Sequence, residues 1–197
     1  MRLVTAITLG ILIVSATGVP RGESETGKRD ESPVVQKEDG NDAARTKVAN
    51  TVSIAAKDPE KVFDIITSAR FWKTWHPATY AVGGVTERPY LLGDVIHERV
   101  RIAGKDIVAT WKVVEHARPS RVVLQAQGSS TRITYSFKAQ GEGIEFRREL
   151  EYEEALLHKL IPDVKALRKA MHEQSEEGVK QLKQLVEKTL RAEAAGF

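Results

Sequence analysis

The sequence predicts an α+β domain: a curved antiparallel sheet of seven strands wraps around a long C-terminal helix, and two short helices follow the first strand. Three observations predict it. Six segments between residues 79 and 153 have strand character. One strand and a helical segment precede them, and a long amphipathic pattern follows them. A single antiparallel sheet has one face to cover, so the long helix is expected to cross it and to leave a cavity between them.

The N-terminal segment predicts export. Residues 1–18 carry one charge, Arg2, followed by an apolar run over residues 3–16. That run is shorter than the ~20 residues of a membrane span. Val14 and Ala16 suit a signal-peptidase site, so we predict a cleaved signal peptide. A retained membrane anchor is the alternative. Either form predicts a periplasmic or secreted protein, which contacts a membrane only through an uncleaved N-terminus.

A polar linker is expected to join this segment to the domain. Residues 19–46 have dense mixed charge and no aromatic residue, which is typical of disorder. We place the domain at residues 47–193. The net charge is only +3, with acidic and basic residues interleaved, and this pattern predicts no nucleic-acid surface. The chain has no cysteine, so a disulfide or a thiolate zinc site is excluded.

The domain begins with a strand in residues 47–56. A helix is expected next, because Asp58 suits the N-cap and Pro59 the first helical position. A break near Ser68 predicts a second short helix, which ends before Pro77. The apolar stripe of the first helix comprises Val62, Phe63, Ile65 and Ile66.

Six further strands follow, and turn sequences separate most of them. The alternation is clearest where Ile133, Tyr135, Phe137 and Ala139 all face one side. The expected ranges are 79–86, 94–102, 106–116, 120–128, 131–139 and 143–153.

A long amphipathic helix is expected to begin at Pro162 and to end near Ala192. One of its faces is marked by residues three or four apart. These residues are Leu160, Val164, Leu167, Met171, Ser175, Gly178, Leu182, Leu185 and Thr189.

Two charged residues interrupt the apolar faces of the predicted strands. Arg148 falls on the side of its strand that carries Phe146 and Leu150, and Glu98 lies between Ile96 and Val100. A buried charge needs a partner, water or a ligand. We interpret Glu98 and Arg148 as polar anchors for a ligand carbonyl or carboxylate. A structural ion pair, or a position at a wet rim, is the alternative.

Aromatic residues surround the same expected cavity. Trp75 and His76 either line its mouth or, with their neighbours, plug the open end of the sheet as core. Trp111, Tyr135, Phe137 and Tyr152 point inward, as ligand contacts or as plain core. The histidines show no metal-ligand spacing, and the sequence predicts no metal and no cofactor. Catalytic residues are not identified.

These segments together resemble a known family. The stretches "DPEKVFDIITSARFWKTWHP", "ATWKVVEHARPSRVVLQAQG" and "YSFKAQGEGIEFRRELEY" resemble the polyketide cyclase/dehydrase-like branch of the START/Bet v 1 (SRPBCC) superfamily. The resemblance covers about residues 48–153 and implies the helix-grip fold. The motifs specify the fold better than the activity.

Three functions are considered, of which the resemblance implies the first two and the length of the linker suggests the third. The first, and favoured, is an exported carrier of a small, largely apolar ligand such as a lipid, sterol, quinone or polyketide-like compound. The second is a cyclase or dehydrase, a lyase-type enzyme in which Arg148 polarises a ketone and Tyr135 or Tyr152 donates a proton. The third is docking of another exported protein through the long helix or the linker. Whether the protein is an enzyme stays open.

Overall fold

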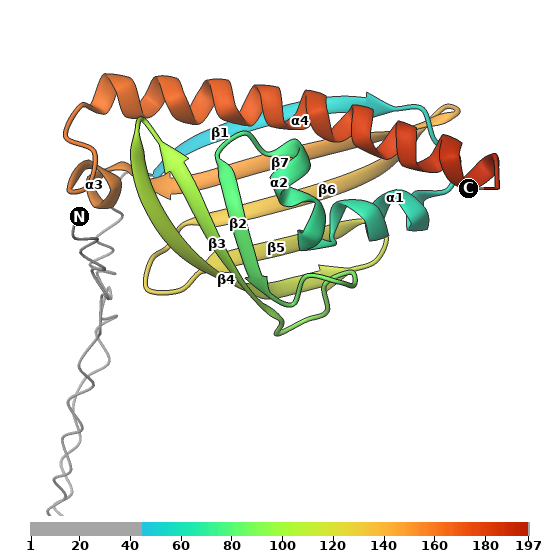
Figure 1. The fold of residues 1–197 in the computed structure, drawn as a ribbon, viewed down its shortest axis with the longest axis horizontal. Helices are drawn as coiled ribbons and strands as arrows, with labels where there is room; N and C mark the ends of the chain where they lie inside the picture. Colours follow the sequence, from blue (N-terminus) through green and yellow to red (C-terminus); the bar gives the residue numbers. More distant parts are fainter. Residues whose placement is uncertain (1–44, 197) are drawn as a thin grey trace, which may run out of the picture. The chain divides into compact units, whose positions relative to one another are not determined.

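One antiparallel sheet of seven strands forms the body of the protein in a computed structural model that describes residues 45–196. The strand order is β1-β7-β6-β5-β4-β3-β2, so the N-terminal strand pairs with the last strand along the chain. The long helix α4 crosses the sheet beside β1 and β7, and α1 and α2 lie near its C-terminal half (Figure 1). This arrangement confirms the predicted fold.

Buried residues alternate with more exposed ones most clearly in the third, sixth and seventh strands, as their sequences predict. Each strand pairs with its neighbour in an antiparallel register, and β2–β3 and β4–β5 contain irregularities. The strands are β1 (Arg45–Ile54), β2 (Thr79–Gly84), β3 (Val95–Ile102), β4 (Lys105–Ala117), β5 (Arg121–Ala126), β6 (Arg132–Gln140) and β7 (Gly143–Glu153).

The first strand begins earlier than expected. β1 starts at Arg45, inside the segment that was predicted to be linker. Arg45 pairs with Glu153, and the Lys47 ammonium contacts the carboxylates of Glu149 and Glu151 on β7 at 2.8 and 2.9 Å. These cross-strand contacts favour the extended conformation of an otherwise polar segment. The predicted signal peptide and the rest of the linker lie outside the described residues.

Short helices follow β1 as predicted. In α1 (Pro59–Ile66), the Asp58 carboxylate accepts hydrogen bonds from the backbone N–H groups of Glu60 and Lys61. A 3₁₀ turn, η1 (Ala69–Phe71), leads into α2 (Trp72–Trp75). The α2 helix ends at His76, whose extended backbone is the conformation favoured before a proline.

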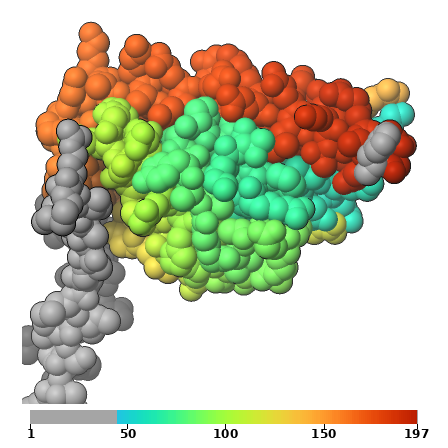
Figure 2. Space-filling view, viewed as in Figure 1, coloured from blue at the N-terminus to red at the C-terminus, as the bar shows by residue number. Residues whose placement is uncertain are grey.

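The C-terminal helix begins later than predicted. In α4 (Val164–Ala194), the Asp163 carboxylate accepts from the Ala166 N–H at 2.9 Å and caps the helix, so Pro162 lies before the helix. A further short helix, α3 (Glu154–His158), was not predicted. In the space-filling view, the segment around α1 and α2 lies against α4 and covers the strands behind it (Figure 2).

Among the described residues, no helix is both long and apolar enough to cross a membrane.

Candidate functional site

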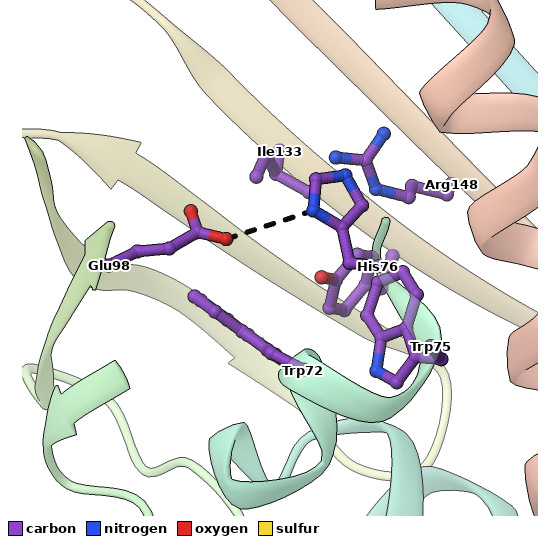
Figure 3. Close-up of a pocket in the computed structure, with 7 residues that line it drawn as sticks. Trp72, Trp75, His76, Glu98, Ile133 and Arg148 are labelled. Carbon is purple, nitrogen blue, oxygen red and sulfur yellow. Dashed lines mark ion pairs between the residues drawn. The ribbon is translucent and has the colours of Figure 1, made fainter. Parts of the chain in front are cut away.

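A small cavity lies on the inner face of the sheet, where strands β3, β6 and β7 meet helix α2. The space open to the centre of a water molecule is about 10 Å³, which is room for about one water molecule. Charged, polar and aromatic side chains meet there (Figure 3). The residues that line the cavity are Trp72, Trp75, His76, Glu98, Ile133, Tyr135 and Arg148.

Arg148 is a buried cation on the sheet's inner face, on the strand next to the edge strand β1. It stands on β7 between Asn50 of β1 and Tyr135 of β6 in the strand register, and only 3 % of it is exposed. Its Nη1 group donates to the Ser175 hydroxyl on α4 at 2.9 Å, and that hydroxyl donates to Asn50 Oδ1 at 2.7 Å. Arg148 Nε has no hydrogen-bond partner among the described residues.

Glu98 is the second buried charge, with 5 % of it exposed. One carboxylate oxygen accepts a hydrogen bond from the Thr79 hydroxyl, and the other accepts from Trp111 Nε1 at 2.8 Å. Burial raises the pKa of Glu98, while the hydrogen bonds from Thr79 and Trp111 oppose that shift. Both oxygens therefore have donors already within the protein.

His76 lies between these two charges (Figure 3). Its Nδ1 is 2.8 Å from the Thr79 hydroxyl and 3.8 Å from a Glu98 oxygen, and 13 % of its side chain is exposed. Burial lowers the pKa of His76 to about 3, and the positive charge of Arg148 adds to the shift. The imidazole is therefore neutral at physiological pH.

The hydrogen bonds assign the His76 tautomer. The Thr79 hydroxyl has a single hydrogen, which it donates to Glu98. Thr79 can then only accept from His76, so Nδ1 carries the imidazole proton and Nε2 is an acceptor. In Figure 3, the ring's other nitrogen faces the Arg148 guanidinium. An ordered polar chain thus runs from Trp111 through Glu98, Thr79 and His76 towards Arg148.

Tyr135 completes the polar part of the lining. Burial raises its pKa to about 12, although the neighbouring Arg148 opposes the shift, so the phenol stays protonated at neutral pH. Its position directly opposite Arg148 in the β6–β7 register sets a neutral donor beside a cation. Such a pair is suited to hold a ligand oxygen.

The other aromatic residues singled out from the sequence divide between the cavity and the core. Trp75 lines the cavity, whereas Trp111 reaches it only through its hydrogen bond to Glu98. Phe137 packs against Phe63 and Phe146, with ring centroids 5.1 and 5.2 Å apart. Tyr152 is fully buried and does not line the cavity.

The sequence left open a structural ion pair between Glu98 and Arg148. The two side chains form no such pair. The carboxylate is held by Thr79 and Trp111, the guanidinium by Ser175, and the imidazole of His76 stands between them. Both charges are buried, so they do not sit at a wet rim.

Sequence reasoning missed several residues of this site. Thr79 and Ser175 bind the two charges, Asn50 orients Ser175, and Trp72 and Ile133 line the cavity. The sequence did mark Asn50 and Ser175, since each is a polar residue on the otherwise apolar face of its strand or helix. The same signal identified Glu98 and Arg148.

No group of histidine and acidic side chains suited to a metal ion occurs in residues 45–196.

Comparison with known families gives one match. Residues 45–187 match the family described as polyketide cyclase / dehydrase and lipid transport. No match was found among curated proteins.

Solved structures share the fold at low sequence identity. The Zhui aromatase/cyclase from Streptomyces sp. R1128 has a TM-score of 0.59 and 13% identity, over 76% of this chain and 98% of that one. TTHA0849 from Thermus thermophilus has a TM-score of 0.57 and 20% identity, over 72% and 97%. The di-domain ARO/CYC BexL from the BE-7585A biosynthetic pathway has a TM-score of 0.56 and 18% identity, over 73% and 50%. At such identities, these likenesses establish the helix-grip fold alone.

Proposed function

Since the chain belongs to the polyketide cyclase / dehydrase and lipid transport family, we propose that it is an exported binding protein for a small, largely apolar ligand. The ligand is of the lipid, sterol, quinone or polyketide-like kind. It occupies the cavity on the inner face of the sheet beside helix α2, and its polar group is bound at Arg148. Mostly apolar pockets with a few convergent polar groups are typical of such sites.

The observation that carries this proposal is the state of Arg148. The guanidinium is almost fully buried, donates to the neutral Ser175 hydroxyl, and keeps an unpartnered Nε–H. A buried donor without a partner costs about 1–3 kcal/mol, and more when the group is charged. A fold carries such a cost readily where a bound molecule offsets it.

The size of the cavity adds a condition to the proposal. Its volume of about 10 Å³ is far below the roughly 300–1,000 Å³ of typical ligand sites. A ligand must therefore displace part of the lining as it enters. Trp72, Trp75 and His76 come from the four-residue helix α2 and its C-cap, and this short element is the part best suited to move.

Native mass spectrometry of the exported protein, followed by organic extraction, tests the proposal. We expect a bound apolar molecule at a stoichiometry close to one. Arg148→Leu should lose it, because the polar anchor is removed while the apolar lining remains. Arg147→Leu is the matched control, since Arg147 is the neighbouring residue on the outer face, where it pairs with Glu149 at 2.9 Å.

The control should keep the ligand at the wild-type level. A wild-type protein that is empty, and that Arg148→Leu stabilises, would show a packed core with no binding function.

One observation favours a second function, that of a cyclase or dehydrase. Tyr135 and neutral His76 flank Arg148, so a proton donor and a proton acceptor stand beside a cation that can polarise a ketone. If the site is catalytic, Arg148→Ala should abolish turnover of a poly-β-ketone substrate while ligand binding persists. Unchanged turnover in that variant would exclude this role.

A further inference from the structure

The arginines of this protein differ sharply in their partners. Six exposed arginines lie 2.6–2.9 Å from carboxylate oxygens, whereas buried Arg148 forms no ion pair within the described residues. The paired six are Arg88, Arg101, Arg118, Arg121, Arg147 and Arg168. The guanidinium that burial makes most costly thus has no counter-charge among the described residues.

Glu98 does not supply that counter-charge. Its two oxygens accept from Thr79 and Trp111, and the neutral His76 imidazole stands between it and Arg148 (Figure 3). The guanidinium has five N–H donors, of which Ser175 takes one. The partner that Arg148 lacks is therefore an acceptor, and a negative charge would satisfy it best.

The other side chains around Arg148 also favour a ligand group that accepts hydrogen bonds. The Tyr135 hydroxyl, opposite Arg148 on β6, can donate to the same ligand oxygen. The Nδ1–H of His76 and the hydroxyl of Ser175 already donate to Thr79 and Asn50, so neither competes with Tyr135 as a donor to a ligand oxygen. A carboxylate suits this set, because its two oxygens can accept from the guanidinium and the phenol together.

We propose that the ligand is an amphiphilic carboxylic acid, whose carboxylate binds Arg148 and Tyr135 and whose apolar part lies among the aromatic residues of α2 and the sheet. This inference rests on the proposed function, and it narrows the ligand from an apolar molecule to an acid. A sterol, a quinone or a lipid alcohol lacks the charge that Arg148 requires.

Calorimetric titration of the full chain at neutral pH with three probes tests it. Octanoic acid carries the charge and the chain, octanamide carries the chain and a carboxylate-shaped neutral group, and acetate carries the charge alone. We expect octanoic acid to bind roughly tenfold or more tightly than octanamide, because hydrogen bonds to charged groups are about twice as strong. Acetate should bind far more weakly than either, because it buries almost no apolar surface.

The outcomes separate the inference from the function on which it rests. If octanamide binds as tightly as octanoic acid, the inference that the ligand is a carboxylic acid is wrong, while the proposed binding of an apolar ligand stands. If acetate binds as tightly as octanoic acid, Arg148 binds an anion, and the proposal that the ligand is largely apolar is wrong. Binding by none of the three would overturn both.

Variants add a test within the same titrations. Arg148→Met should bind octanoic acid no more tightly than octanamide, and octanoic acid far more weakly than the unmodified protein does, whereas Arg147→Met should keep the preference for the acid. A preference that survives Arg148→Met would overturn the assignment to Arg148. The comparison of octanoic acid with octanamide in the unmodified protein needs no variant, so a failure of Arg148→Met to fold would not affect it.

Discussion

At the scale of single residues, His76 is the group that makes the site sensitive to acid. Its folded-state pKa of about 3 lies well below the ~6.5 of an unfolded chain, so between these values only the unfolded state binds the proton. Its contribution to the free energy of unfolding is fully present above pH ~6.5 and is lost as the pH falls towards 3. We expect a loss of about 2 kcal/mol between pH 7 and pH 5.

Urea unfolding across this pH range measures the effect. His76→Asn keeps a donor near the Nδ1 position but cannot be protonated, so its unfolding free energy should depend less on pH than that of the wild type. Glu98, Arg148 and Tyr135 also face the ring, and Glu98 acts in the opposite direction because its pKa is raised. These groups are common to both proteins, so the difference between the two curves isolates His76.

His97 provides the matched control for this prediction. It is exposed on β3, and its Nδ1 lies 3.1 Å from the Thr110 hydroxyl, as His76 lies beside Thr79. His97→Asn should leave the pH dependence of the wild type intact. If His76→Asn and His97→Asn gave the same pH dependence, the imidazole of His76 would not be the group that is kept neutral by burial.

The sequence predicted part of the site at this scale. Strand alternation placed Glu98 and Arg148 on the inner face. Residues two apart in a strand share a face, so a residue with a buried apolar residue two positions away on either side must point to the same side as they do. It did not predict that they stand apart, since the positions of His76, Thr79 and Ser175 depend on contacts between distant elements. Those three residues come from the end of α2, the start of β2 and the middle of α4.

At the scale of elements, Gly178 permits the close approach of α4 to the end of α2. A Cβ atom at Gly178 would lie 3.3 Å from His76 Cδ2, 3.5 Å from Pro77 Cδ and 3.5 Å from the Trp75 ring. His76 cannot easily retreat, because its imidazole is held by Thr79. Glycine is otherwise unfavourable in a helix by about 1 kcal/mol relative to alanine, so packing explains its position in α4.

Gly178→Val should therefore destabilise the protein, although valine favours helix more than glycine does. We expect the free energy of unfolding to fall by about 1–3 kcal/mol, measured by urea denaturation, because overpacking must displace His76 or α4. Glu177→Val is the matched control on the exposed neighbouring position and should change stability by no more than ~0.5 kcal/mol. Equal effects of the two variants would mean that the helix tolerates a side chain against α2.

The sequence predicted the elements better than it predicted their contacts. The last strand has the predicted bounds, because alternation and turn residues are local signals. The helix α3 was missed, since its five residues are too few for a periodic pattern. The close contact at Gly178 was also missed, because the sequence pattern marks a helical face without showing what packs on it.

At the scale of the whole molecule, the family and the fold follow from the order of the elements, while the size of the cavity does not. One helix across a curved sheet predicted a gap between them. How far the aromatic side chains fill that gap depends on rotamers and packing that no periodic pattern encodes. The outcome is a cavity of about 10 Å³ around two buried charges, so ligand entry must be coupled to movement of the lining.

Export is the prediction that concerns the chain as a whole. Residues 1–44 lie outside the described part, and the domain that follows contains no disulfide that would report an oxidising compartment. We propose that signal peptidase cleaves after Ala16, because small residues are required at that position and two residues before it. Intact-mass measurement of the full-length chain expressed in a bacterial host should then show a product that begins at Thr17.

A bulky residue at the cleavage position provides the matched test. Ala16→Phe should leave the chain unprocessed and held at the membrane, whereas Leu12→Phe keeps the apolar run and should be processed like the wild type. A wild-type chain that keeps residues 1–16 and fractionates with membranes would show that the segment is an anchor. An uncleaved wild-type chain in the cytoplasm would contradict export, and the carboxylic acid would then have to be sought among intracellular compounds.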